Sequence, residues 1–122
     1  ILRMKNSMGK ILKIPATIYP VDIVVFWGGN VEDIKTYLEL NYKNSTDIFK
    51  NIHFHNAGYT YIDEHTVFMY IQEAYSEDIG ILVHECFHAA EFILDYVGVV
   101  HCTESSEAFA YLLQYILNEI VK

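Results

Sequence analysis

Two long helical segments close the sequence, at about 79–97 and about 104–121, and each carries one polar stripe on an otherwise apolar surface. The polar residues of both segments are spaced 4, 3 and 4, which places each set within about 60° of the helix circumference. They are His84, His88, Glu91 and Asp95 in the first segment, and Glu107, Tyr111, Gln114 and Asn118 in the second. Buried polar groups need partners. We therefore expect the two stripes to face each other.

The rest of the chain predicts a small sheet. Val21 to Trp27 is β-branched and aromatic and ends at two glycines, as a strand and turn do. Asn30 is a suitable cap for a helix at 31–42, residues 41–46 are expected to form a loop, and the period-two pattern of 52–72 predicts a hairpin with its turn near 63–65. Gly98 is a suitable stop for the first long helix. The fold class is α+β: a small mixed or antiparallel sheet packed against the two long helices.

Composition indicates one domain and excludes several classes of protein. A chain of 122 residues that is 52% hydrophobic can bury one core without disulfide bonds. We expect a basic segment at 1–14 and a domain at 15–122, which holds 4 basic and 16 acidic side chains, a formal charge of −12. That charge argues against a nucleic-acid partner, and the absence of a run of about 18 apolar residues argues against a membrane span.

The cysteine content points to a reducing compartment. The chain has two cysteines, and one of them, Cys86, lies inside a strongly apolar helical stretch. A reduced, buried thiol is the usual state of such a residue. We therefore expect a cytoplasmic protein.

The first long helix contains the motif HExxH, at His84 to His88. Residues i and i+4 lie one turn apart on the same helix face, so both histidines can present a ring nitrogen to one Zn²⁺. Glu85 is rotated by about 100° around the axis, which lets its carboxylate reach a metal-bound water without displacing it. The motif is short enough to arise by chance, so the polar stripe around it is what favours a zinc site.

A glutamate on the facing helix is the natural third ligand. We favour Glu107, because Glu104 sits in the first turn, where the helix dipole favours a carboxylate without any metal. Glu104, His101 and the absence of a third ligand remain alternatives. Glu91 and Asp95 are expected to hydrogen-bond the back of a ligand ring or a neighbouring backbone group. Candidates for stabilising an oxyanion are Tyr111, His101, His53, His55, Tyr59 and Tyr61.

The motif at 84–88, followed by Glu107-Ala108-Phe109-Ala110-Tyr111-Leu112-Leu113, resembles the gluzincin branch of the zinc metallopeptidases. It is most similar to the small ImmA/IrrE-type domains and to short phage-encoded zincins. The resemblance covers about 79–117, and it departs from the family in that Phe109 comes one place early and no Leu-Met-Pro follows. It implies a minimal zincin-like fold with His84, His88 and Glu107 as ligands, Glu85 as general base, and an edge strand beside the metal on which a peptide adds.

The sequence thus predicts a zinc metallopeptidase that binds one Zn²⁺ per chain and hydrolyses a peptide or protein substrate. One alternative is a catalytically inactive zinc-binding module, for example phage-encoded, that docks on a protein partner. A second is a helical packing domain without metal, in which the polar stripes hydrogen-bond to each other.

Overall fold

The computed structural model describes residues 9–122, and within them four strands form one mixed sheet in the order β1-β2-β4-β3. The strands are β1 (Lys10–Pro15), β2 (Asp22–Trp27), β3 (Gly58–Asp63) and β4 (Thr66–Ile71). The helices are α1 (Val31–Asn41), α2 (Ser45–Asn51), α3 (Ile79–Tyr96) and α4 (Ser106–Val121), with short 3₁₀ turns at Glu73–Tyr75 and Thr103–Ser105. Strands β2 and β4 are parallel, and the two outer strands, β1 and β3, are antiparallel to their neighbours. The predicted α+β class is confirmed at this level.

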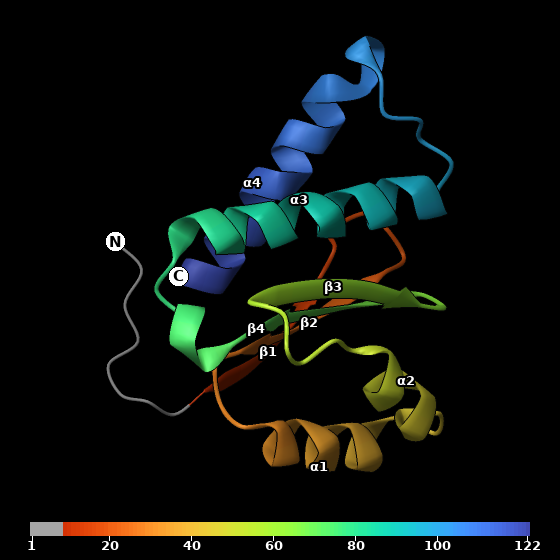
Figure 1. Cartoon of the computed structure of the whole chain (residues 1–122). Helices are drawn as coiled ribbons and strands as arrows, with labels where there is room; N and C mark the ends of the chain where they lie inside the picture. Colours follow the sequence, from red (N-terminus) through yellow and green to blue (C-terminus); the bar gives the residue numbers. More distant parts are fainter. Residues whose placement is uncertain (1–8) are drawn as a thin grey trace.

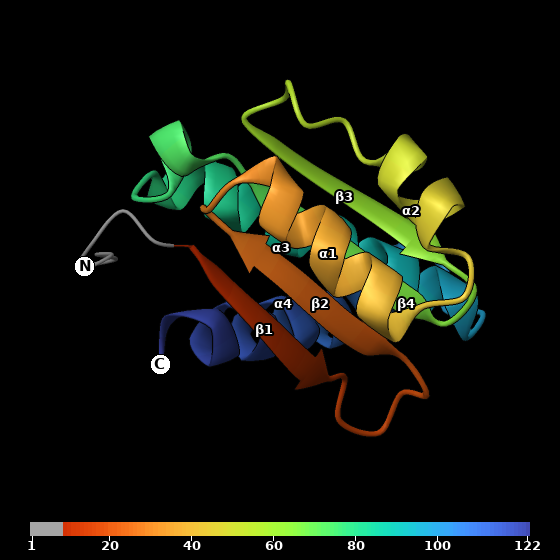
Figure 2. The ribbon, with the colours of Figure 1, turned by 90° about the horizontal axis from the view of Figure 1, so that it is seen from below.

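Helices cover both faces of the sheet, so the molecule has three layers (Figure 1). The long helices α3 and α4 lie on one face and enclose a core with alternate residues of the central strands, including Ile23, Val25 and Met69. On the other face α1 and α2 cover a largely aromatic core around Phe26 and Phe68 (Figure 2). Because successive strand residues point to opposite faces, β2 supplies both cores, which explains its nearly continuous apolar sequence.

Several sequence signals fix the ends of elements as predicted. The Asn30 side chain accepts a hydrogen bond from the Asp33 amide (2.8 Å), and α1 begins one residue after Asn30. Helix α3 ends in a Schellman motif, in which Gly98 has a φ of +85° and the Val99 amide donates to the Leu94 carbonyl (2.8 Å). The hairpin turn lies at 64–65, between β3 and β4.

Two elements differ from the expectation. Residues 45–51 form the short helix α2, where part of the segment was expected to be loop, and Ile48 of this helix is buried in the aromatic core. Residues 10–14, expected to belong to the basic segment, are part of strand β1, which is paired along its whole length with β2. The remainder of that basic segment, residues 1–8, lies outside the described residues.

The expectation that the two polar stripes face each other is wrong. On α4 the predicted stripe, Glu107, Tyr111, Gln114 and Asn118, is exposed, and the apolar side of the helix faces the core with Phe109, Leu112, Ile116 and Ile120. On α3 the stripe is also at the surface, since His84 and Asp95 are exposed and His88 and Glu91 are partly exposed. Both helices are therefore ordinary amphipathic helices that turn their polar sides to water. Across residues 9–122, no helix is long and apolar enough to cross a membrane.

Candidate functional site

The two histidines of the motif converge on one point at the surface of α3. Their Nε2 atoms are 3.1 Å apart, and their rings are nearly perpendicular, at 77°. Two nitrogens that each lie about 2.05 Å from one tetrahedral zinc ion are about 3.3 Å apart. The pair therefore has the spacing that a shared zinc ion requires, as the helical periodicity predicts.

Glu91 orients one of these rings. Its Oε1 lies 3.1 Å from Nδ1 of His88, and both side chains are about 40% exposed (41% for His88 and 39% for Glu91). A carboxylate accepts hydrogen bonds, so this contact favours the His88 tautomer that carries its proton on Nδ1 and leaves the Nε2 lone pair free to bind a metal. This is the contact expected of Glu91, and it is the arrangement by which outer carboxylates orient histidine ligands in metal sites.

The Glu85 side chain points toward strand β3. Its side chain is buried (5% exposed), and the hydroxyl of Thr60 donates a 2.5 Å hydrogen bond to its Oε1. Gly58, two residues earlier on the same strand, lies directly against the carboxylate: a Cβ at this glycine would come within 3.0 Å of Glu85 Oε2. Thr60 and Gly58 were not predicted, although the period-two pattern of the hairpin places them together on one face.

A cavity of about 380 Å³ adjoins both halves of the motif. It is lined by His84 and Glu85 from α3, by Gly80 and Ile81 from the start of that helix, and by residues 56–58 leading into β3. Strand β3 is the edge strand of the sheet on this side and packs against α3. The motif therefore lies where an edge strand, a cavity and two ring nitrogens meet.

The residues predicted on α4 are not brought to the histidine pair. Glu107 is exposed in the first turn of α4, Glu104 is exposed in the preceding 3₁₀ turn, and Tyr111 is 65% exposed. Within residues 9–122, no three His, Cys, Asp or Glu side chains lie close enough together to hold a metal ion. Glu107 as third ligand thus remains a prediction, which this conformation does not assemble.

Asp95 and His101 lie together on a second cavity, of about 330 Å³, between the end of α3 and the start of α4. The His101 ring packs on Phe109 with 4.2 Å between ring centroids, and 5.7 Å separates it from the centroid of Phe87. Glu91 lines the same cavity, so this cavity and the histidine pair are connected through that one carboxylate.

The remaining oxyanion candidates are placed elsewhere. Tyr59 and Tyr61 point to the face of the sheet covered by α1 and α2, opposite Glu85, because β3 alternates its side chains. The Tyr61 hydroxyl donates to Asp63 (3.1 Å). His53 and His55 are exposed, and His53 stacks on Tyr59 with 4.3 Å between centroids. An oxyanion role for the two tyrosines is therefore wrong, and the physical reason is the parity of the strand.

Neither cysteine takes part in this arrangement. Cys86 is buried on the core side of α3, and burial raises the pKa of its thiol to about 12 because the charged thiolate is poorly solvated there. Cys102 is exposed, and both thiols are free.

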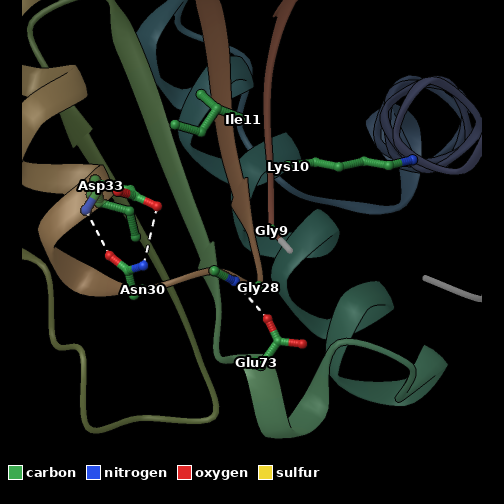
Figure 3. A pocket seen from close by; sticks show the side chains of 9 residues that line it. Gly9, Lys10, Ile11, Gly28, Asn30, Asp33 and Glu73 are labelled. Atoms are coloured by element: carbon green, nitrogen blue, oxygen red, sulfur yellow. Dashed lines mark hydrogen bonds between the residues drawn. The ribbon is translucent and has the colours of Figure 1, made fainter. Parts of the chain in front are cut away.

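A larger cavity, about 470 Å³, lies beside the turn between β2 and α1 (Figure 3). Glu73 points into this turn, and its Oε1 accepts a hydrogen bond from the Gly29 amide (2.7 Å). The residues that line the cavity include neither histidine nor cysteine, and none of them belongs to the motif. The carboxylate of Glu73 accepts the hydrogen bond of a backbone amide in the turn, which is a structural role. This cavity is therefore separate from the site on the HExxH helix.

Comparisons of the chain with protein-family models, curated proteins and solved structures found no match.

Proposed function

We propose that this protein is a zinc-dependent peptidase. The observation that carries the proposal is the convergence of the His84 and His88 Nε2 atoms at 3.1 Å on one exposed point of a helix, next to a buried glutamate. The donor set fits zinc, which is commonly held by imidazole nitrogens and carboxylates. Glu107 is the proposed third ligand, so binding has to bring its side chain, free at the surface of α4, to the histidine pair.

A zinc ion held by His84, His88 and Glu107 would supply Lewis acidity, which would make water acidic enough to lose a proton near neutral pH and would polarise a carbonyl group. Glu85 is the base that takes a proton from the attacking water as the water oxygen bonds to the carbonyl carbon of the substrate. When the bond between that carbon and the peptide nitrogen breaks, Glu85 returns the proton to the nitrogen, which leaves as an amine. The products are a carboxylic acid and an amine, and one water is consumed.

The surroundings of the motif favour a peptide as substrate. Strand β3 is an edge strand, and extended peptides bind to such edges by adding one more strand. The cavity of about 380 Å³ that His84 and Glu85 line has room for one side chain of that peptide.

The test compares the wild type with Glu85→Gln on a peptide library, with and without a chelator. Glutamine keeps the size of the side chain and removes the base, so we expect zinc content to stay the same and cleavage to fall by at least about 100-fold. Cleavage by Glu85→Gln at the wild-type rate, or cleavage by the wild type that a chelator leaves unchanged, would show that the proposal is wrong.

A zinc-binding module without catalytic activity is the second candidate function. It requires no catalytic arrangement of Glu107, which is not near the histidine pair in this conformation. This candidate predicts that the wild type binds zinc but cleaves no member of the library.

A further inference from the structure

Glu85 is an unusual buried group. Among residues 9–122, Glu85 is the one acidic side chain that is buried, with 5% of its surface exposed. Burying a carboxylate is costly unless hydrogen bonds replace the lost water. The structure shows one such replacement within the site, the hydroxyl of Thr60, which is itself only 8% exposed.

The geometry of this contact is specific. Thr60 Oγ1 lies 2.5 Å from Glu85 Oε1 and 3.3 Å from the backbone carbonyl oxygen of the same residue. Distances near 2.5 Å are typical of strong hydrogen bonds from a hydroxyl to a carboxylate. The hydroxyl therefore sits over the side chain of Glu85 and fixes the rotation of its carboxylate.

Gly58 lies next to the other carboxylate oxygen of Glu85, Oε2. A Cβ at residue 58 would come within 2.8 Å of Glu85 Cγ and 3.0 Å of Oε2, closer than van der Waals contact allows. Glycine at this position leaves the space that the carboxylate occupies. Gly58 and Thr60 point to the same side of β3, so one strand face supplies both the space and the hydrogen bond.

We propose that Thr60 is a positioning residue for Glu85: its hydroxyl holds Oε1, so that Oε2 is kept ready to take the proton from water in the adjoining cavity. The inference rests on the proposed peptidase function. It assigns to the edge strand β3 a second role beside that of receiving the substrate. In this account Thr60 touches neither the substrate nor the metal, and it acts only through Glu85.

The experiment uses two pairs of proteins that differ in the hydroxyl: the wild type with Thr60→Val, and Thr60→Ser with Thr60→Ala. Thr60→Val replaces the hydroxyl by a methyl group of similar size, and Thr60→Ser keeps the hydroxyl but loses the methyl group. Thr60→Ala differs from Thr60→Ser only in the hydroxyl. If Thr60→Val fails to fold, the comparison of the serine and alanine variants still isolates the hydroxyl.

We expect variants that keep the hydroxyl at residue 60 to stay active and variants that lack it to lose activity. In Thr60→Val and Thr60→Ala, kcat should fall by at least about tenfold, since a misplaced base loses proton-transfer efficiency, while KM and zinc content stay the same. Thr60→Ser should keep kcat within about threefold of the wild type. A contact that only stabilises the fold would leave kcat per folded molecule unchanged in all three variants.

A second readout needs neither metal nor activity. In urea unfolding of the metal-free protein, Thr60→Val should raise the unfolding equilibrium constant by at least about tenfold when Glu85 is present, and by less than about threefold in a Glu85→Ala background. Equal effects in the two backgrounds would show that the hydrogen bond does not form in solution and would overturn the inference.

The two levels of the account fail in different ways. Absence of Glu85-dependent cleavage in the wild type would refute the peptidase function, and the positioning role would fall with it. Full kcat in Thr60→Val, with an active wild type, would refute the positioning role alone.

Discussion

His84, Glu85 and His88 belong to one turn of α3, yet their environments differ sharply. His84 is exposed, His88 is partly exposed with a carboxylate behind its ring, and Glu85 is buried against β3. The difference follows from the rotation of about 100° per residue, which turns the histidines to water and the glutamate toward the sheet. At this scale the sequence predicts the site well, because the contacts of His84, His88 and Glu91 all lie within one helix and depend on spacing alone.

The contact between Glu91 and His88 predicts a specific effect on zinc binding. Glu91→Gln replaces the ionised acceptor by a neutral amide, so the His88 ring is held less firmly and its Nε2 is less basic. We expect zinc affinity to fall by about 10- to 100-fold, measured by competition with a chromogenic chelator. Asp95→Asn, on the same helix stripe one turn further, is the control and should change affinity less than about threefold. Equal affinities for Glu91→Gln and the wild type would contradict the orienting role.

The two cysteines should react very differently. Burial raises the Cys86 pKa to about 12, so between pH 7 and 9 this thiol stays protonated and is shielded from reagents. Cys102 is exposed. A thiol reagent at pH 8 should therefore modify about one thiol per native chain, and about two after denaturation. Rapid modification of both thiols in the native protein would show that α3 does not pack as described.

At the scale of elements, local signals predicted the ends of α1 and α3 and the turn of the hairpin, whereas packing decided the rest. Helix α2 was missed because only Ile48 is fully buried and Phe49 partly buried in a segment of mostly polar residues. The orientation of α4 was wrong for a related reason. A polar stripe at helical spacing is consistent with either a buried polar contact or an exposed helix face. Which of the two forms depends on where the core lies.

The end of α3 predicts a measurable cost. Gly98 has a φ of +85°, and a Cβ at this position would meet nothing within 4 Å, so the cost of a side chain there is purely conformational. Gly98→Ala should lower the free energy of unfolding by about 1 kcal/mol in urea titrations. Asparagine tolerates this conformation better, so Gly98→Asn should cost less than Gly98→Ala. An alanine variant as stable as the wild type would contradict the Schellman ending.

At the scale of the whole molecule, the fold places an edge strand next to the HExxH helix. No short-range sequence pattern predicts that these two elements pack together. The pairing of β3 with β4 was predictable, but the packing of β3 against α3 joins residues 25 positions apart, Thr60 and Glu85. Periodicity gives the face on which Thr60 lies but not the helix that covers it. The contact between Thr60 and Glu85 therefore required the structure.

The third ligand is a prediction at this scale, because it joins α3 to α4. If Glu107 completes the site, Glu107→Gln should reduce zinc affinity by at least about 100-fold, measured by the same chelator competition, since the charged ligand is lost. Glu104→Gln, about one turn earlier and also exposed, is the matched control and should bind zinc as the wild type does. Unchanged affinity in Glu107→Gln would assign the third position to another group.

The central claim is that His84 and His88 hold a zinc ion, and elemental analysis of the purified protein after addition of zinc and removal of the excess tests it most directly. The account predicts about one zinc per chain in the wild type and in His53→Ala, which removes an exposed histidine away from α3, and less than about a tenth of a zinc in His84→Ala. No zinc in the wild type, or equal zinc in the wild type and His84→Ala, would contradict the account.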